Sequence, residues 1–269
     1  MLGTGSPLPS PDRAGPATLL RAGAATLLFD CGRGVVMRLA AAGVLPVGLS
    51  AVFLTHLHSD HITDLNDIVT TRWVMSPGPL PLRVIGPPGT QQVVDGVLAM
   101  LSLDQGYRLA HHATLEQGPS VEVTEVEPGH TLEVSGVAVL VHRTDHRPVQ
   151  PTVGYRVEHE GAVAAIAGDT VPCPELDAMC AGADLYVQTV IRDDLVRAIP
   201  NGRLQDILDY HSTVEQAAQT ATRAGVATLV LTHYVPPLAP GDAEAWRALA
   251  SAHFSGRIVL GDDLTVATA

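Results

Sequence analysis

The run Thr55-His56-Leu57-His58-Ser59-Asp60-His61 follows the apolar segment 51–55 and places three imidazoles and a carboxylate within six positions. In an extended chain His56 and His58 point to the same side, while a turn into a helix directs Asp60 and His61 toward a second point. The alternative without a function is a solvated polar loop or a set of histidines packed in the core, but core packing rarely requires so many imidazoles together. The run therefore predicts that two metal ions share one loop.

The ligand types narrow the choice of metal. Neutral imidazole nitrogen and carboxylate oxygen are ligands that zinc and manganese accept. Cys31, Cys173 and Cys180 form no CxxC pair, so neither a closed thiolate zinc site nor a disulfide framework is expected. We interpret these cysteines as small buried apolar side chains.

A two-metal site needs further ligands, each at the end of a strand. Asp169 and His233 follow apolar segments that end at Ala167 and Thr232, and His146 follows another that ends near His142. A carboxylate can bridge two ions about 3.5–4 Å apart, which is the role expected of Asp169. Either His142 or His146 could turn inward, and His146 is favoured because His142 lies within the predicted strand.

His211 stands before a helix that Ser212 or Thr213 can cap. It is either a surface histidine beside a helix cap or a general acid for a leaving oxygen, since a pKa near neutrality suits proton delivery. The spacing alone leaves both interpretations open.

Short apolar runs alternate with helical patterns along the chain. Strands are predicted at 24–29, 51–55, 82–85, 121–126, 137–142, 153–157, 163–167, 185–188, 228–232 and 258–260, and helices at 34–42, 62–73, 90–101, 174–180, 213–224 and 243–252. This interleaving predicts an α/β sandwich. No repeat, long linker or composition shift divides the chain, so residues 1–269 are expected to form one domain.

Composition limits the partners. The formal net charge of −12 argues against broad electrostatic capture of nucleic acid, although a local basic rim is compatible with it. The start of the chain does not have the form of a signal peptide, and no apolar run reaches the length of a membrane span. A cytoplasmic protein without membrane contact is expected.

Together these residues resemble the metallo-β-lactamase superfamily and, within it, the ribonuclease Z branch, over nearly the whole chain. Besides the histidine run, the matching segments are 2–6 with Pro9 and Arg13, Phe29–Gly32, Gly86–Gly89, His146 with Gly154–Arg156, Gly168–Thr170, and His211–Thr213 with Gln216–Ala218. The resemblance implies a four-layer αβ/βα sandwich with two metal ions at one edge of the sheets.

The resemblance also implies roles for the site residues. His56, His58 and His146 would hold one ion, and Asp60, His61 and His233 would hold the other, with Asp169 between them. Asp60 would accept a proton, and His211 would be the second catalytic histidine. Zinc is the expected ion, with manganese and iron also compatible. Relatives of this branch are commonly dimers, so a homodimer is expected.

Two departures from the branch bear on the substrate. Members that cut precursor tRNA usually carry a long arm before the Gly-Asp-Thr turn, whereas here residues 157–167 leave room only for a tight hairpin at His159–Gly161. The Ser-Arg-Tyr that usually follows the last histidine is replaced by residues 234–237. The sequence therefore predicts a phosphodiesterase of ribonuclease Z type acting on tRNA precursors or other RNA. The alternatives are a hydrolase for small phosphodiesters or sulfate esters, such as a cyclic nucleotide phosphodiesterase or an arylsulfatase-like enzyme, and a catalytically silent metal-binding protein.

Overall fold

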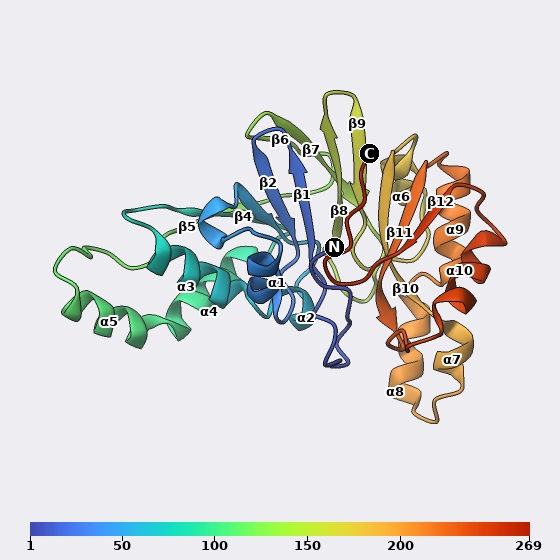
Figure 1. Cartoon of the computed structure of the whole chain (residues 1–269), viewed down its shortest axis with the longest axis horizontal. Coiled ribbons are helices and arrows are strands. Elements are labelled where there is room, and N and C mark those ends of the chain that lie inside the picture. The colour runs from blue at the N-terminus through green and yellow to red at the C-terminus, as the bar shows by residue number, and fades with distance from the viewer.

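Two β-sheets face each other at the centre of the computed structural model, which describes residues 1–269 (Figure 1). The five-stranded sheet has the order β1 (Thr18–Ala22), β2 (Ala25–Phe29), β3 (Ala51–Phe53), β4 (Leu82–Gly86) and β5 (Val121–Glu125). The seven-stranded sheet has the order β12 (Arg257–Leu260), β11 (Thr228–Val235), β10 (Leu185–Ile191), β9 (Ala162–Ile166), β8 (Val153–His159), β7 (Val137–Arg143) and β6 (Thr131–Val134).

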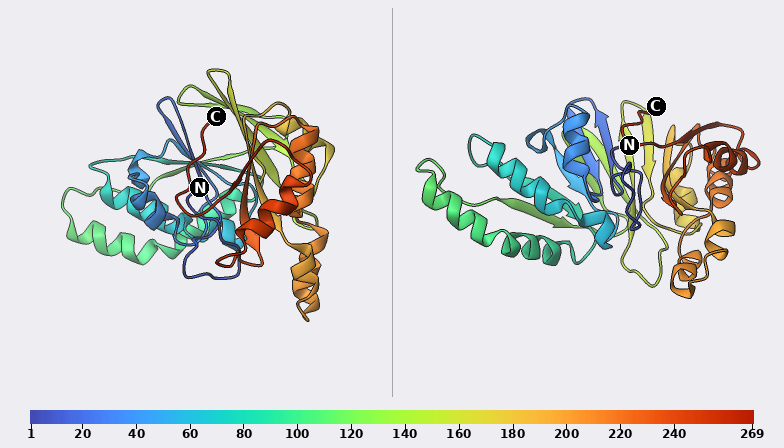
Figure 2. Two further views of the ribbon diagram at one scale, coloured as in Figure 1. Left: turned by 45° about the vertical axis from the view of Figure 1, so that its right-hand side comes forward. Right: turned by 60° about the horizontal axis from the view of Figure 1, so that its bottom comes forward.

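Helices cover the outer faces of the sheets, as two further views make clear (Figure 2). The first sheet carries α1 (Val35–Ala41), α3 (Leu65–Met75) and α4 (Thr90–Met100), and α5 (Ser102–His111) extends beyond them. The second carries α6 (Pro174–Cys180), α9 (Val214–Arg223) and α10 (Ala243–Ser251). Three short helices complete the set, namely α2 (Ser59–Ile62), α7 (Asp193–Arg197) and α8 (Gly202–Gln205). The predicted α/β sandwich is confirmed.

Strand alternation explains why both faces of the central strands are apolar. On β2, Leu27 and Phe29 pack between the sheets, while Leu28 packs with the helices of the first outer layer. The layer between the sheets also contains Phe53 and Tyr155, one from each sheet. The other outer layer buries Trp246 and its neighbours against the second sheet. Three apolar layers thus hold four layers of secondary structure together.

The metal-site prediction depends on the directions of the strands. β2, β3 and β4 are parallel neighbours, and β9, β10 and β11 are parallel neighbours in the other sheet. β7 runs the same way as β9, because both are antiparallel to β8. The backbone N–H of Val153 donates to the Thr55 carbonyl at 2.9 Å and joins the two sheets where β3 ends. The carboxyl ends of β7, β9 and β11 therefore lie at one edge.

The predicted strands are all present, and β1 and β6 were not predicted. Both are edge strands with exposed polar positions, which weakens their apolar pattern. The predicted helix 62–73 is wrong at its start, because α2 and α3 are separate helices. Asp64 separates them, since its backbone N–H donates to the Cys31 carbonyl at 2.9 Å and not to a carbonyl of the helix. α5, α7 and α8 were also missed; α5 buries no residue and α7 and α8 are short.

The remaining predictions concern cysteines, loops and the hairpin. All three cysteines are free; Cys31 and Cys180 are buried as predicted, whereas Cys173 is half-buried because it precedes α6 at a helix end. The tight hairpin is confirmed: a two-residue turn of Glu160 (φ 49°) and Gly161 (φ 86°) joins β8 and β9. None of the helices combines the length and apolar character that a membrane span requires.

Candidate metal centre

The predicted ligands meet at the edge where β3, β7, β9 and β11 end. Their ligand atoms form two groups, and within each group all the atoms lie within 4.8 Å of one another. One group is His56, His58, His146 and Asp169, and the other is Asp60, His61 and His233. All of these side chains are buried except His58, which is half-buried. The histidines that the sequence placed outside the site, His111, His112, His130, His142, His159 and His253, belong to neither group.

Asp169 lies at the centre of the cluster. Its Oδ2 is 3.2 Å from His211 Nε2, 3.5 Å from His61 Nε2, 3.7 Å from His233 Nε2, 3.8 Å from His56 Nε2 and 3.9 Å from His146 Nε2. Its other oxygen, Oδ1, is buried without a hydrogen-bond partner. The preceding Gly168 has φ 65°, and a Cβ there would come within 2.6 Å of Thr55, so glycine is required for this approach. The turn places one carboxylate in contact with both ligand groups.

The donor atoms fit divalent metal ions. His58 Nδ1 lies 3.0 Å from His56 Nε2 and 3.3 Å from His146 Nε2, so three ring nitrogens converge on one point. In the other group His61 Nε2 is buried without a partner. Orphaned buried polar atoms are rare in folded proteins, and a cation would satisfy these. Imidazole and carboxylate donors without thiolate match zinc, manganese or iron at a site that performs chemistry.

The electrostatics favour the metal-binding protonation state at His56, His146 and Asp169, whereas the charge of Asp169 outweighs burial and raises the pKa of His61 and His233 in the metal-free protein. Burial lowers the pKa of His146 to about 4. Burial and nearby His61 lower the pKa of His56 well below its ordinary value. Both rings are therefore neutral at pH 7. Burial alone would raise the pKa of Asp169, but His233 and His61 outweigh it and hold the pKa well below its usual value. Asp169 is therefore an ionised carboxylate.

Backbone carbonyls near the end of the α7–α8 segment orient two of the rings. His146 Nδ1 donates to the Tyr210 carbonyl at 2.8 Å, and His211 Nδ1 donates to the Ile207 carbonyl at 3.1 Å. Each bond fixes the proton on Nδ1 and turns Nε2 toward Asp169. The carbonyls of Tyr210 and Ile207 were not predicted, because a backbone acceptor leaves no mark on residue identity.

The helix after His211 is anchored as predicted. The Thr213 side chain accepts from the Gln216 N–H, and the Gln216 side chain accepts from the Thr213 N–H, which makes a capping box at the start of α9. The Ser212 hydroxyl donates to the Thr170 carbonyl at 2.7 Å and ties the same segment to the Asp169 turn. His211 is buried and faces the cluster, so it is not a surface histidine.

His233 adopts an uncommon backbone conformation. Its φ is 54°, in the left-handed region that few residues other than glycine adopt, and it lies within the buried strand β11. Such a conformation costs on the order of 1–3 kcal/mol and is concentrated at functional sites. The His233 Nε2 is 3.2 Å from Asp60 Oδ2, so this conformation directs the ring into the ligand cluster.

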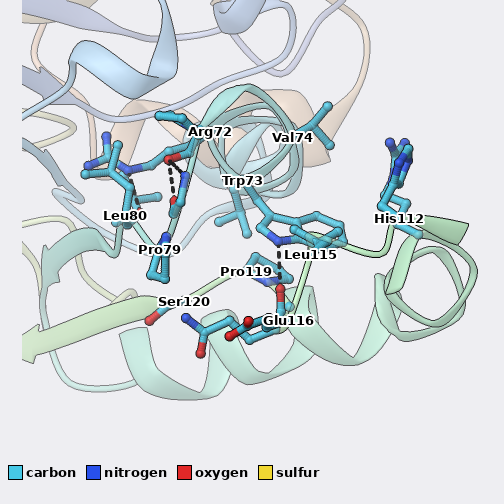
Figure 3. Close-up of a pocket in the computed structure, with 18 of the residues that line it drawn as sticks. Arg72, Trp73, Val74, Pro79, Leu80, His112, Leu115, Glu116, Pro119 and Ser120 are labelled. Carbon is cyan, nitrogen blue, oxygen red and sulfur yellow. Dashed lines mark hydrogen bonds between the residues drawn. The ribbon is translucent and has the colours of Figure 1, made fainter. Parts of the chain in front are cut away.

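A pocket of about 540 Å³ lies elsewhere, at the end of α3 remote from His61 (Figure 3). Residues 76–80 and 114–120 line it, together with Trp73 and the buried Arg72. The guanidinium of Arg72 makes four hydrogen bonds, because it donates to the carbonyls of Pro46, Leu49, Leu80 and Pro81. The Trp73 indole N–H donates to the Gln117 carbonyl. These polar groups hold the loops in place and are not directed at a ligand.

The chain resembles known proteins over nearly its full length. Residues 25–234 match the family described as the β-lactamase superfamily domain. Ribonuclease Z of Mycolicibacterium paratuberculosis is 58% identical over 266 residues, covering 98% of this chain and 95% of that protein. Ribonuclease Z of Mycobacterium tuberculosis is 56% identical with the same coverage.

Solved structures show the same fold. The metallo-β-lactamase fold protein YhfI from Bacillus subtilis superposes with a TM-score of 0.73 at 21% identity and covers 97% of this chain and 94% of its own. The short form of human tRNase Z has a TM-score of 0.71 at 24% identity and covers 99% of this chain and 96% of its own. The architecture is therefore shared beyond the range of close sequence similarity.

Proposed function

We propose that this chain, which belongs to the β-lactamase superfamily and within it to the ribonuclease Z family, is a metal-dependent endoribonuclease that cuts a phosphodiester bond in tRNA precursors. One observation carries the proposal: two ligand groups and His211 surround a single buried carboxylate, Asp169, in a chain 58% identical to a ribonuclease Z. We assign His56, His58 and His146 to one ion and Asp60, His61 and His233 to the other, with Asp169 bridging.

Zinc is the proposed metal, because the donor set is imidazole and carboxylate in two compact groups. Divalent ions bound there supply Lewis acidity for the phosphate and lower the pKa of water. Metal analysis of protein purified without added metal tests this proposal. Two zinc ions per chain are expected, and manganese or iron at that stoichiometry would change the metal while leaving the ligand assignment intact.

Asp60 and His211 are the proposed proton-transfer residues. Burial opposes ionisation of Asp60, but the hydrogen bond from His233 lowers its pKa, so the carboxylate is ionised and can accept a proton from the attacking water. His211 Nε2 lies 3.2 Å from Asp169 Oδ2 on the other side of the cluster, where it can donate a proton to the departing oxygen or stabilise a phosphate oxygen.

The short β8–β9 turn favours a second candidate, a hydrolase of small phosphodiesters or sulfate esters, because the turn offers no arm to hold tRNA. However, the alignment covers 95% of a relative named ribonuclease Z. That relative therefore has little additional length in which to carry a long arm. We therefore favour RNA as the substrate. The first candidate is supported by the length match and the second by the turn alone.

Parallel assays on three substrates separate the candidates. Metal-loaded protein is incubated with a tRNA precursor that carries a 3′ trailer, with cyclic AMP and with an aryl sulfate. Release of the trailer is expected for the wild type. His58→Ala should abolish it, and His142→Ala, a histidine outside both ligand groups, should retain it. Hydrolysis of cyclic AMP or the sulfate without trailer release would select the second candidate.

We also propose that the protein is a cytoplasmic homodimer. Met100 at the end of α4 and Leu103 and Tyr107 on α5 are 61%, 70% and 70% exposed, and a second copy would cover these large apolar side chains. Sedimentation at micromolar concentration should give a dimer, and Leu103→Glu should shift it to the monomer. A wild-type monomer under those conditions would contradict the proposal. Fractionation of cells tests the location.

A further inference from the structure

Tyr210 lies beside the ligand cluster and stands directly before His211 in the chain. The segment 192–210 follows β10, carries α7 and α8, and ends at this tyrosine (Figure 1). The Tyr210 ring centroid is 5.0 Å from that of His146 and 4.8 Å from that of His211, and the Tyr210 carbonyl accepts from His146 Nδ1. The side chain therefore packs against both a proposed metal ligand and the proposed acid.

The hydroxyl of Tyr210 differs from those of the buried tyrosines. Tyr155, Tyr186 and Tyr234 each donate to an oxygen of the protein. The Tyr210 hydroxyl has no partner in the protein and is reached by solvent, since the side chain is only half-buried. A phenol is protonated at pH 7, so this hydroxyl has a proton to donate to a bound molecule.

The neighbouring histidine places this donor near the bond that is cut. In the proposed reaction His211 acts on the departing oxygen. When the attacking water leaves the phosphate on the 3′ trailer, the departing oxygen is O3′ of the last nucleotide before the cut. The adjacent carbon of the same ribose carries the 2′-hydroxyl. A donor that packs against His211 is therefore close to this hydroxyl when the bond is aligned for cleavage.

Nearby charges favour a neutral acceptor over a second phosphate. Asp206 and Asp209 begin and end the helical turn that leads into Tyr210, and both are exposed without an ion-pair partner. Their negative charges repel a phosphate beside the tyrosine. A ribose 2′-hydroxyl is neutral, can accept a hydrogen bond, and is the group by which a protein distinguishes RNA from DNA at a given position.

We propose that Tyr210 is a specificity-determining residue whose hydroxyl donates a hydrogen bond to the ribose 2′-hydroxyl next to the departing O3′. The inference rests on the proposed function, because it requires an RNA substrate and His211 at the departing oxygen. A hydrogen bond between neutral groups corresponds to a factor of about 3 to 10 in kcat/KM. Tyr210 therefore makes the enzyme prefer a ribonucleotide immediately before the cleaved bond.

The test compares two tRNA precursors that differ by one oxygen atom. One is ribose throughout, and the other has 2′-deoxyribose only at the nucleotide before the cleaved bond. The wild type should have a kcat/KM about 3- to 10-fold higher on the first substrate. In Tyr210→Phe the ratio of the two kcat/KM values should be close to 1, because the ring stays and only the donor is removed. Circular dichroism checks that the variant is folded.

Two controls accompany this comparison. Tyr107→Phe removes the hydroxyl of an exposed tyrosine on α5 and should keep the wild-type ratio. A third precursor, with its single 2′-deoxyribose after the cleaved bond, should be cut by the wild type as the all-ribose substrate is.

The outcomes are distinct. A Tyr210→Phe protein that keeps the wild-type ratio, whether or not it loses activity on both substrates, would overturn the inference and leave Tyr210 a structural residue. A wild type that cuts the first two substrates equally well would overturn it without any variant, and so would a loss that follows the deoxyribose placed after the cleaved bond. A wild type that cuts none of the precursors would instead overturn the proposed function itself.

Discussion

Replacement of Tyr155 by phenylalanine removes one oxygen atom from the layer between the two sheets. The Tyr155 side chain is fully buried, and its hydroxyl donates to the Leu54 carbonyl at 2.6 Å. Leu54 lies on the segment that leads from β3 into the ligand run, so this bond links the second sheet to the start of the metal loop. The ring packs against Phe53 with centroids 5.1 Å apart and against Phe29 at 5.6 Å.

The cost follows from these contacts. Phenylalanine keeps both ring pairs but leaves the Leu54 carbonyl buried without this donor, which costs about 1–3 kcal/mol. In a chain of this size about 2 kcal/mol corresponds to a melting temperature lower by roughly 4–8 °C. Tyr155→Leu also loses the two aromatic pairs, each worth about 0.5–1.5 kcal/mol, and should be less stable than Tyr155→Phe.

The assay is urea unfolding of metal-free protein, so that metal binding does not contribute to stability. Tyr107→Phe is the control, because the substitution keeps the ring that the proposed dimer covers and removes only a hydroxyl on a side chain that is 70% exposed in the single chain, so the free energy of unfolding should stay unchanged. If the free energy of unfolding of Tyr155→Phe lay within about 0.5 kcal/mol of the wild-type value, the reasoning would be refuted, because a buried carbonyl that loses its donor should destabilise the protein by more than that.

Further predictions concern pH, metal, the helix cap and a buried arginine. The pKa of His146 is about 4 in the folded protein, below its ordinary value of 6.5. The free energy of unfolding of metal-free protein should therefore fall by up to about 3 kcal/mol as the pH falls from 6.5 toward 4. His146→Ala should flatten the pH dependence of urea unfolding over that range. A chelator should lower the melting temperature of metal-loaded protein, and zinc at about 1,000 times its dissociation constant should restore about 4 kcal/mol, whereas magnesium should restore little. Thr213→Ala should cost about 1 kcal/mol through loss of the capping box, and Thr213→Ser should cost less, as measured by urea unfolding. Arg72→Met should lower the free energy of unfolding by more than about 3 kcal/mol, because four carbonyls lose a charged donor. A variant with the melting temperature of the wild type would show that those carbonyls find other partners.

Some of the centre was predictable because several ligands lie at or just beyond the carboxyl end of a predicted apolar strand. His56, Asp169 and His233 come directly after apolar runs, and parallel strands bring such ends to a common edge. The choice of His146 over His142 also agrees with the structure, since only His146 joins a ligand group. Their roles as metal ligands stay predictions, as does the single domain.

Other features depend on geometry that residue types do not encode. Asp30 and His233 adopt left-handed backbone conformations, and although aspartate and histidine adopt them more often than most residues, residue type alone does not show which position will do so. The break between α2 and α3 arises because the Cys31 carbonyl, distant in sequence, captures the Asp64 N–H. Edge strands and exposed helices were missed for a different reason, namely that they bury too little apolar surface to produce a pattern.

The turn at Glu160 and Gly161 lies at the opposite end of β8 and β9 from the metal edge, because β8 begins beside Thr55 and β9 leads to Asp169. A seven-residue strand such as β8 spans about 20 Å. A segment grafted into this turn would therefore lengthen the molecule's reach along a bound substrate without disturbing any ligand. The turn and the ligand cluster lie at opposite ends of the same two strands, so the length of this turn can vary without moving a ligand.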